Sequence, residues 1–245
     1  MARTKDIKNK PKRVIIYGPS GSGKTYFAGS FPNPIFVDLD DGMITLAHVD
    51  VEYYTINGSP TKDVEAVKLM GDKLAASNNS YLKTIALLEH YINTLDDSST
   101  LVLDSLSIFT DAALEHVLDL GGVKTPRRQD WGAAQKLIET VISAFRKAKC
   151  HVVVIAHEQF MKDEESGLIS WLPLTIGKLC TKLPLYFDEV YHSYAERGKG
   201  SEKGKMIYGI ETSPTRRTTA KSRSALIGNI EFPTFENLYK VKTKK

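Results

Sequence analysis

The sequence predicts an α/β fold in which helices cover both faces of a mostly parallel central sheet and antiparallel strands are added at its C-terminal side. Short apolar runs alternate with longer helical patterns over residues 13–156, and this alternation is typical of βαβ units and a parallel sheet. Two strand-like runs at 187–194 and 206–211 are joined by a glycine- and lysine-rich loop, which favours antiparallel pairing. With 245 residues, 42% of them hydrophobic, the chain can bury one full core.

The expected elements follow these runs in order. Parallel strands are expected at 14–17, 35–37, 100–103 and 151–156. A glycine-rich turn at 18–23 leads into a short helix that must end near Gly29, because Pro32 and Pro34 cannot continue it. Two helices are expected between 62 and 96, separated at Asn78 and Asn79, and a long amphipathic helix is expected at 131–147.

One domain is expected over residues 13–240, between a basic N-terminal tail at 1–12 and a basic C-terminal tail at 241–245, because no internal repeat interrupts the pattern. The net charge is only +4, but lysine and arginine crowd the two tails and the stretch 197–223. Such clustering suits a polyanionic partner. The alternative is that these basic stretches are simply solvated.

Composition also bears on the cellular setting. No apolar run approaches the roughly 20 residues that a membrane-spanning helix needs, and the polar, basic first residues do not resemble a secretory signal. Cys150 and Cys180 are too few and too far apart for a disulfide framework or a metal site. We therefore expect a cytoplasmic protein with reduced thiols and no membrane partner.

A complete phosphate-binding loop of the pattern G-x-x-x-x-G-K-[ST] stands between the first strand and the first helix. Its glycines allow backbone N–H groups to turn inward around phosphates, and the helix adds the positive end of its dipole. The lysine would contact the β- and γ-phosphates, and the threonine hydroxyl would bind Mg²⁺. The predicted nucleotide-binding residues are Gly18, Pro19, Ser20, Gly21, Ser22, Gly23, Lys24 and Thr25. The pattern therefore predicts binding of ATP with Mg²⁺.

Two later strands end in aspartates. The apolar run 100–103 ends at Asp104, which would hold Mg²⁺ at the carboxyl edge of the sheet, where open α/β sheets bind ligands. The run 35–37 is followed by Asp38, Asp40 and Asp41. Side chains two apart on a strand share a face, so Asp38 and Asp40 are expected to point the same way, and a carboxylate there could deprotonate the attacking water. The alternative is a solvated turn before Gly42.

The strand at 151–156 leads directly into His157, Glu158 and Gln159. A polar side chain just past a central strand can hydrogen-bond the γ-phosphate and change position when that phosphate leaves. Gln159 and His157 are both candidates for this role, although a lone histidine is more often a structural group.

This order of motifs resembles the RecA/RadA-like recombination ATPases, and among them the phage-encoded RecA-like nucleotide-binding proteins associated with single-strand annealing recombination. Three shorter stretches are also similar: 129–132 at the start of the long helix, 177–190, and 219–223, which is similar to a K-x-R element. The resemblance covers roughly residues 13–240. It implies a RecA-like P-loop NTPase core.

The resemblance also implies site residues. Asp40 falls where RecA-like proteins have their catalytic glutamate, and its side chain is one methylene shorter, which implies slow hydrolysis. Lys221 and Arg223 match the element by which relatives reach a neighbour's nucleotide, which implies a homo-oligomer, either a ring or a filament. The expected catalytic residues are Lys24, Asp40, Gln159, Lys221 and Arg223.

DNA contacts are implied in the same way. The segment 119–130 matches the first DNA-binding loop of the relatives and offers Lys124, Arg127 and Arg128. The segment after Gln159 matches the second loop, but its acidic residues at 163–165 suit phosphates poorly. We therefore expect DNA contacts from 119–131 and from the basic stretch 197–223. In that stretch the expected contacts are Lys199, Lys203 and Lys205.

The favoured hypothesis is a slowly hydrolysing, ATP- and Mg²⁺-dependent RecA-like protein that acts on single-stranded DNA in recombination or strand annealing. A single-stranded DNA-binding protein and other recombination proteins are candidate partners. One alternative is a small-molecule P-loop kinase, in which the loop at 197–205 would act as a lid, although the sequence shows no acceptor site. The other alternative is a nucleotide-gated interaction module with negligible turnover.

Overall fold

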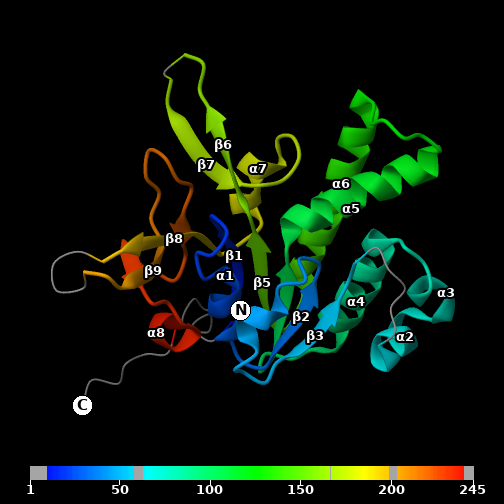
Figure 1. The fold of residues 1–245 in the computed structure, drawn as a ribbon, viewed down its shortest axis with the longest axis horizontal. Coiled ribbons are helices and arrows are strands. Elements are labelled where there is room, and N and C mark those ends of the chain that lie inside the picture. The colour runs from blue at the N-terminus through cyan, green and yellow to red at the C-terminus, as the bar shows by residue number, and fades with distance from the viewer. Residues whose placement is uncertain (1–9, 58–62, 166, 199–202, 240–245) are drawn as a thin grey trace, which may run out of the picture.

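A computed structural model describes residues 10–57, 63–165, 167–198 and 203–239 of the chain (Figure 1). The main sheet has the strand order β11-β9-β8-β1-β5-β4-β2-β3, and β10 pairs with β8. The parallel strands are β1 (Arg13–Tyr17), β2 (Pro34–Asp38), β3 (Glu52–Thr55), β4 (Thr100–Asp104), β5 (His151–Ala156) and β8 (Glu189–Arg197). The antiparallel strands are β9 (Met206–Glu211), β10 (Lys221–Ser222) and β11 (Asn229–Glu231). The predicted fold class is confirmed, although antiparallel pairing begins only after β8.

The central strands bury both faces, which is why their sequences are nearly continuous apolar runs. Along β1, Ile15 and Tyr17 pack in one core cluster, while Val14 and Ile16 pack in the other, as strand alternation requires. The first cluster lies against α4 (Ser80–Thr94), α5 (Leu106–Gly121) and α6 (Arg128–Ala144). The second lies against α1 (Lys24–Gly29), the 3₁₀ turn η2 (Met43–Leu46) and α8 (Phe235–Tyr239).

The long helix α5, which is not predicted from the sequence, begins directly after β4. The Ser105 side chain caps its first turn, and Leu106, Phe109 and Ala113 are buried at the spacing of one helical face. Because α5 continues to Gly121 and α6 begins at residue 128, the loop expected at 119–130 is wrong in its bounds. Only residues 122–127 connect the two helices.

A β-hairpin, also not predicted, follows β5. Its strands are β6 (Glu158–Lys162) and β7 (Ile169–Pro173), and they pair antiparallel. The hairpin occupies the segment that resembles a second DNA-binding loop. Figure 1 shows the hairpin and the tips of α5 and α6 extending beyond the same edge of the sheet, at which β5 ends.

The other helices differ from expectation mainly at their ends. The sequence predicts a helix boundary at Asn78 and Asn79. In the structure the Asn79 side chain caps the N-terminus of α4. Ahead of it, the backbone at Gly71 divides the first expected helix into two short ones. The long helix expected at 131–147 is α6, which begins three residues earlier, at Arg128. Short elements not predicted or only approximately placed are α2 (Val64–Met70), α3 (Asp72–Ala75), η3 (Phe145–Lys147), α7 (Leu179–Lys182) and η4 (Leu183–Leu185).

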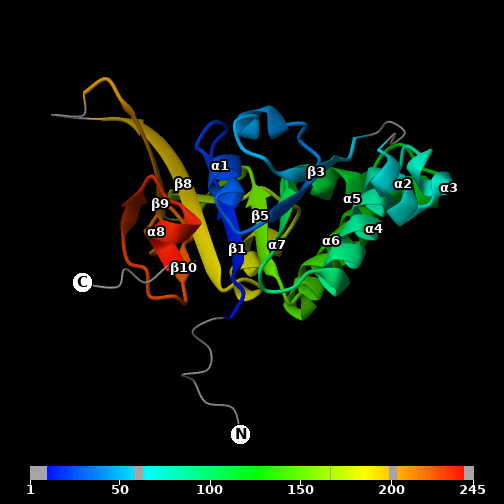
Figure 2. The same cartoon turned by 90° about the horizontal axis from the view of Figure 1, so that it is seen from below.

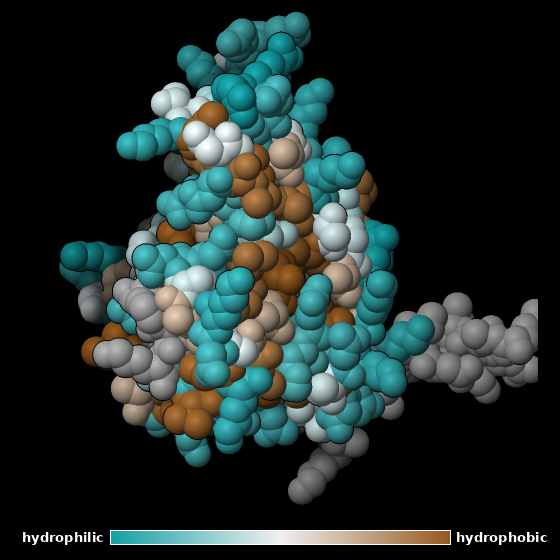
Figure 3. All heavy atoms as spheres, turned by 90° about the vertical axis from the view of Figure 1, so that its right-hand side faces the viewer, coloured by the Kyte–Doolittle hydropathy of each residue, from teal (hydrophilic) through white to brown (hydrophobic). Residues whose placement is uncertain are grey.

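Figure 2 shows β8, β9 and α8 at one end of the molecule and α2 and α3 at the other. The face drawn in Figure 3 is largely hydrophilic, with apolar side chains gathered near its centre. Within the described ranges, no helix has the length and apolarity needed to cross a membrane. Cys150 and Cys180 are both buried and not disulfide-bonded. The predicted tails lie largely outside the described residues, so their boundaries stay a prediction.

Candidate functional site

The phosphate-binding loop joins β1 to α1 in a conformation that depends on its glycines. Gly21 and Gly23 have φ angles of 76° and 87°, in the left-handed region that favours glycine. Gly18 lies so close to β8 that a Cβ atom on it would be 2.3 Å from Ser193 Oγ. These three positions explain why the loop carries glycine there.

Lys24, the first residue of α1, is buried inside this loop, with 7% of its surface exposed. Its Nζ donates to the carbonyl oxygens of Gly18 at 3.0 Å and Pro19 at 2.7 Å. Burial lowers the pKa of Lys24, and the negative charges around it act in the opposite direction. In decreasing order of effect, these come from Asp104, Glu158 and Asp40. The ammonium group is therefore held where a nucleotide's phosphates would need it.

Thr25 and Asp104 meet beside this lysine. The Thr25 hydroxyl donates to Asp104 Oδ2 at 2.9 Å. Burial raises the pKa of Asp104 to about 7, with smaller contributions from the carboxylates of Asp40 and Asp38 that act against the lowering effect of the Thr25 hydrogen bond. A hydroxyl and a carboxylate in contact next to the P-loop lysine are the protein ligands that Mg²⁺ takes in P-loop sites. These residues therefore fit Mg²⁺ bound together with a nucleotide.

The expectation that Asp38 and Asp40 point the same way stays a prediction, although both carboxylates raise the pKa of Asp104. The chain turns after Asp38, because Asp38 Oδ1 accepts the backbone N–H of Asp40 at 3.1 Å. Asp38 is fully buried, and burial raises its pKa. Among the described residues, its Oδ2 has no hydrogen-bond partner. Strand alternation ends with β2 and does not reach Asp40.

Asp40 instead faces the ends of β4 and β5. Its Oδ1 accepts the Ser105 hydroxyl at 2.8 Å, and its Oδ2 lies 2.9 Å from His157 Nε2. Burial alone would raise the pKa of Asp40, but the hydrogen bonds from His157 and Ser105 outweigh it and the pKa is lowered. The structure thus brings Asp40 and His157 together at the edge that carries Lys24.

A second group at this edge is absent from the sequence-based predictions. Glu158 Oε2 lies 2.9 Å from His192 Nε2, and His192 Nδ1 lies 3.2 Å from Glu211 Oε2. The Thr218 hydroxyl donates to the same Glu211 oxygen at 2.5 Å. These residues come from β6, β8, β9 and the segment after β9, and no spacing in the sequence links them. The only signal was the position of Glu158 just past a central strand.

The amide of Gln159, the residue expected to contact the γ-phosphate, is bound to backbone carbonyls in the structure, and its role as a sensor stays a prediction. Its Nε2 donates to the carbonyl oxygens of Pro173 and Thr175, each at 3.2 Å. The side chain therefore closes the base of the β6–β7 hairpin. Its neighbours His157 and Glu158 make the contacts at the edge of the sheet instead.

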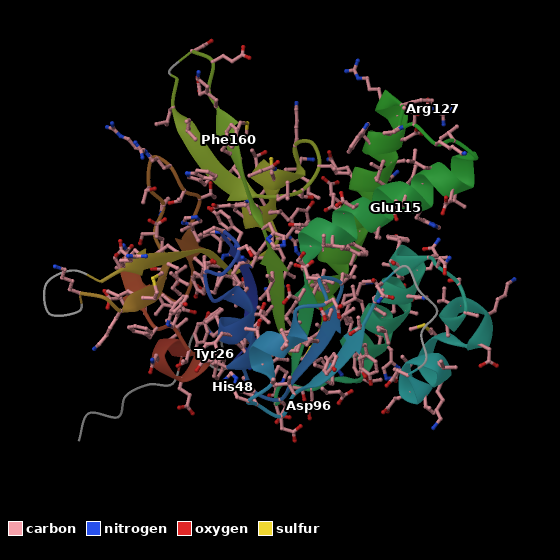
Figure 4. The ribbon with its side chains drawn as sticks, in the orientation of Figure 1. Tyr26, His48, Asp96, Glu115, Arg127 and Phe160 are labelled. Atoms are coloured by element: carbon pink, nitrogen blue, oxygen red, sulfur yellow. The ribbon has the colours of Figure 1, made fainter. Side chains whose placement is uncertain are left out.

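A cavity of about 480 Å³ adjoins the P-loop, between α1, β8, β9 and the segment before α8. Its aromatic lining comes from Tyr26, Phe27, Tyr208 and Phe232. Tyr26 lies beside His48 (Figure 4), with ring centroids 5.8 Å apart and planes inclined by 16°. The volume and the aromatic lining are suited to a flat heterocycle such as a nucleobase.

Lys221 and Arg223 lie at the opposite edge of the sheet from the P-loop. The strand β10 pairs with the first two residues of β8, which are level with the start of β1. The Lys221 ammonium donates to the carbonyl oxygens of Pro184 and Phe187, and Arg223 Nη1 lies 2.8 Å from Asp188 Oδ1. Within one chain, neither residue can serve the nucleotide bound at the carboxyl edge. Contact with a neighbour's nucleotide stays a prediction.

The predicted DNA-binding residues belong to two separate parts of the molecule. The set comprises Lys124, Arg127, Arg128, Lys203, Lys205 and Lys199. Lys124 and Arg127 lie in the connection of α5 with α6, and Arg128 is the first residue of α6. Figure 4 labels Arg127, which pairs with Asp130 at 3.0 Å. Lys203 and Lys205 precede β9, on the other side of the molecule in Figure 1. Lys199 lies outside the described residues.

Comparison with known proteins identifies the family. A family model described as an AAA domain matches residues 10–224, which include the P-loop, Asp104 and both carboxylate–histidine pairs. The chain belongs to this AAA domain family. A P-loop ATPase domain is thereby confirmed, while hydrolysis, the RecA/RadA resemblance and the role in recombination stay predictions.

No curated protein matches this AAA domain. Among solved structures, it is similar to a chain from work titled "Structural and biochemical analysis of a prototypical ATPase from the type III secretion system of pathogenic bacteria". The two are 12% identical, with a TM-score of 0.44, and the alignment covers 75% of this chain and 52% of the other. The AAA domain thus spans about half the length of that ATPase.

Proposed function

We propose that this AAA domain hydrolyses ATP with Mg²⁺ and, as a homo-oligomer, uses the nucleotide cycle to act on single-stranded DNA in recombination or strand annealing. The observation that carries the proposal is the hydrogen bond from Thr25 to Asp104 beside the buried Lys24. Lys24 would neutralise the phosphates, and Thr25 and Asp104 would hold Mg²⁺. When bound, Mg²⁺ supplies positive charge for the oxygens of the transferred phosphate.

The aromatic cavity supports binding of a whole nucleotide rather than of a free phosphate. It opens at Gly21 and Gly23 of the P-loop, so a base placed there and phosphates placed at Lys24 can belong to one molecule. Tyr208 packs close to the loop, because a Cβ atom on Gly23 would lie 3.5 Å from its ring. Aromatic rings stack on the face of any base, so this wall favours a nucleoside without choosing between adenine and guanine.

The aromatic side chains of the β6–β7 hairpin support single-stranded DNA as the substrate, although the acidic residues 163–165 in its turn suit phosphates poorly. Phe160 is 65% exposed and its ring centroid lies 6.0 Å from that of Trp171, on the projecting part of the molecule (Figure 4). Exposed aromatic rings bind single strands by stacking on successive bases. Arg216 and Arg217 are exposed beside the hairpin, where the Arg217 carbonyl accepts the Trp171 N–H at 2.6 Å. Their charges suit the phosphates between the bases.

The same hairpin starts at the nucleotide site, which favours coupling between DNA binding and hydrolysis. Glu158, whose negative charge raises the pKa of Lys24, is the first residue of β6. His157, immediately before it, contacts Asp40. A change in the position of these residues on hydrolysis would therefore reach the strands that carry Phe160.

The proposal is tested by measuring phosphate release and the binding of labelled single-stranded DNA, each with and without the other ligand. We expect DNA to stimulate hydrolysis, and Phe160→Ala to weaken DNA binding roughly tenfold, since stacking on one base contributes about 1–3 kcal/mol. Leu185→Ala is the matched control, because Leu185 is 69% exposed at the far edge of the sheet. Equal affinities for the two variants would remove the hairpin from the proposal.

The alternatives give different results in the same assays. A small-molecule kinase transfers phosphate to a metabolite and gains nothing from DNA. A nucleotide-gated interaction module binds ATP and DNA but releases no phosphate above the rate without protein. Either pattern would contradict the proposed function.

A further inference from the structure

Two carboxylate–histidine pairs lie near the P-loop lysine, since the carboxylate of each pair raises the pKa of Lys24. The consecutive residues His157 and Glu158 face opposite partners: His157 contacts Asp40, and Glu158 contacts His192, each at 2.9 Å. Both carboxylates raise the pKa of Lys24, and Glu158 raises it more than Asp40 does. Besides the proposed Mg²⁺ ligand Asp104, the site therefore holds two acids that raise the pKa of the lysine, whereas the sequence motifs predict only Asp40 there.

Strand register places Glu158 next to the start of the P-loop. Tyr17, the last residue of β1, is level with the last residue of β5 on one side and with His192 of β8 on the other. Glu158 follows β5 and reaches across the end of β1 to His192. Lys24 donates to the carbonyl of Gly18, the residue that follows Tyr17. The carboxylate and the ammonium therefore converge on the same end of β1.

The two acids differ in how fully their oxygens are engaged. Asp40 has a donor on each oxygen, Ser105 on Oδ1 and His157 on Oδ2, and these hydrogen bonds lower its pKa. A lower pKa makes a weaker base. Within the described part of the chain, Glu158 accepts a side-chain hydrogen bond only at Oε2, and its side chain is 17% exposed. Its Oε1 is therefore the better placed to accept a hydrogen bond from water.

We propose that Glu158 is the catalytic carboxylate of ATP hydrolysis and that His192 positions it, an inference that rests on the hydrolysis proposed above. Glu158 accepts a proton from the attacking water while the water oxygen bonds to the γ-phosphorus. The bond from the γ-phosphorus to the bridging oxygen breaks, and its electron pair stays on ADP. The proton then leaves Glu158 for the released phosphate or the solvent. Asp40 keeps a positioning role through His157.

His192 can position Glu158 because its other nitrogen is also held. Nδ1 faces Glu211, which the Thr218 hydroxyl holds in turn. Each ring nitrogen of His192 therefore faces a carboxylate oxygen. Glu211 is not among the groups that act on Lys24. The two nitrogens of His192 therefore have different neighbours: Nε2 faces Glu158, on the side of the P-loop, and Nδ1 faces Glu211 on the other side of the ring.

The test compares three acid-to-amide variants of the full chain by phosphate release with ATP and Mg²⁺. Glu158→Gln is expected to lower kcat by about 100-fold or more, the usual contribution of a general base, and Asp40→Asn by about tenfold or less. Glu139→Gln, which breaks an ion pair with Lys182 on the helical side, is the matched control and should stay within about twofold. A larger loss in Asp40→Asn, or a normal rate in Glu158→Gln, overturns the inference.

Binding and folding are measured on the same proteins. The Kd of a slowly hydrolysed ATP analogue should stay within about threefold in Glu158→Gln, because a residue that acts in the transition state alters kcat rather than ground-state binding. A loss of affinity that accounts for the loss of rate overturns the inference. If Glu158→Gln does not fold, Glu158→Asp is measured in its place. Aspartate keeps the negative charge, but its side chain is shorter by one methylene, which moves the carboxylate away from the water. A wild-type kcat in Glu158→Asp counts against Glu158, and a reduced kcat with unchanged Kd supports it.

The positioning role of His192 has its own readout. A glutamine amide can stand in for Nε2, which faces Glu158, and an asparagine amide for Nδ1, which faces Glu211. We expect His192→Gln to keep most of kcat and His192→Asn to lose roughly tenfold, with KM unchanged in both. Equal losses would show a packing role only. A wild type that hydrolyses nothing overturns the proposed function as well, whereas a hydrolysing wild type with unimpaired Glu158→Gln overturns this inference alone.

Discussion

The Thr25 hydroxyl donates to Asp104 Oδ2 at 2.9 Å, across 79 residues of sequence. This contact joins the P-loop to the end of β4, which pairs with both β5 and β2. It gives Mg²⁺ two ligands whose positions are fixed by the sheet. Asp38, level with Asp104 on β2, is buried and serves the turn after its strand. The two aspartates therefore have different roles although both end a strand.

We expect Asp104→Asn to reduce Mg²⁺-dependent hydrolysis far more than Asp38→Asn. Loss of the metal carboxylate removes stabilisation of the transition-state charge and should lower kcat by about 100-fold or more. Asparagine at position 38 keeps the oxygen that accepts the Asp40 N–H and should leave kcat within about fivefold. Steady-state phosphate release at saturating Mg²⁺ measures both. Equal losses would mean that the Mg²⁺ ligand is misassigned.

The raised pKa of Asp104, about 7, predicts a pH-dependent affinity for Mg²⁺. Below this pH a proton occupies the carboxylate of the metal-free protein, and Mg²⁺ must displace it. The apparent affinity should therefore fall roughly tenfold per pH unit below about pH 7 and level off above it. Calorimetric titration of Mg²⁺ with nucleotide from about pH 5.5 to 8.5 measures this, after subtraction of Mg²⁺ binding to free nucleotide. A flat affinity on the acid side would contradict the prediction.

The P-loop and the Asp104 site could be predicted because each is a local pattern on a strand buried on both faces. The Glu158–His192 pair could not, since it depends on the register of β5, β1 and β8, which no local pattern encodes. Gln159 illustrates the same limit. Its position after a strand predicts a phosphate contact. In the structure its amide donates to backbone carbonyls of Pro173 and Thr175, and no pattern in the sequence predicts the hairpin that brings them close.

Lys24→Ala is expected to abolish useful nucleotide binding while leaving the fold intact. The ammonium is the P-loop's charge contact with the phosphates, and water cannot replace it. In the structure its bonds go to carbonyls of the loop itself and not to the core, so the thermal midpoint should change by only a few degrees. Equilibrium titration with ATP and Mg²⁺ measures the binding. Affinity within about twofold of the wild type would contradict the assignment.

Tyr208→Ala tests the aromatic cavity separately from the phosphate site. We expect the affinity for ATP to fall roughly tenfold or more, since stacking of a base on an aromatic side chain contributes about 1–3 kcal/mol. The affinity for inorganic tripolyphosphate should not change, because Lys24 and the loop remain. Ile227→Ala, which removes a side chain that is 85% exposed outside the cavity, is the control. An equal loss for both ligands would place the effect of Tyr208 on the loop and not on the base.

Substitution of Lys221 should lower the thermal stability more than substitution of Arg223. Lys221→Met removes two hydrogen bonds to carbonyls from a partly buried ammonium, a loss of about 2 kcal/mol that corresponds to roughly 4–8 °C in thermal midpoint for a chain of this size. The side chain of Arg223 is 61% exposed and pairs with Asp188 at the surface. Arg223→Ala should therefore shift the midpoint by no more than about 2 °C. Equal shifts, measured by scanning calorimetry, would show that both residues are structural.

If Arg223 is free of a structural role, it is the residue of the pair that can act on a neighbouring copy. It lies at the edge of the sheet opposite the P-loop, so it can approach a nucleotide only when another chain brings its own carboxyl edge to it. We expect Arg223→Ala to bind ATP normally and to hydrolyse it at least about 100-fold more slowly, as loss of an arginine finger does.

Mixing decides whether this contact is made in trans. Lys24→Ala lacks a working nucleotide site but retains Arg223, and Arg223→Ala has the reverse defect, so mixed assemblies contain sites in which both groups are present. A trans contact predicts partial recovery of hydrolysis that depends on the mixing ratio and rises with protein concentration. If Arg223 only neutralises DNA, turnover without DNA stays normal in Arg223→Ala, and the salt dependence of DNA binding falls by about one unit of slope. Mixtures that co-assemble but recover no activity at any ratio would exclude the trans contact.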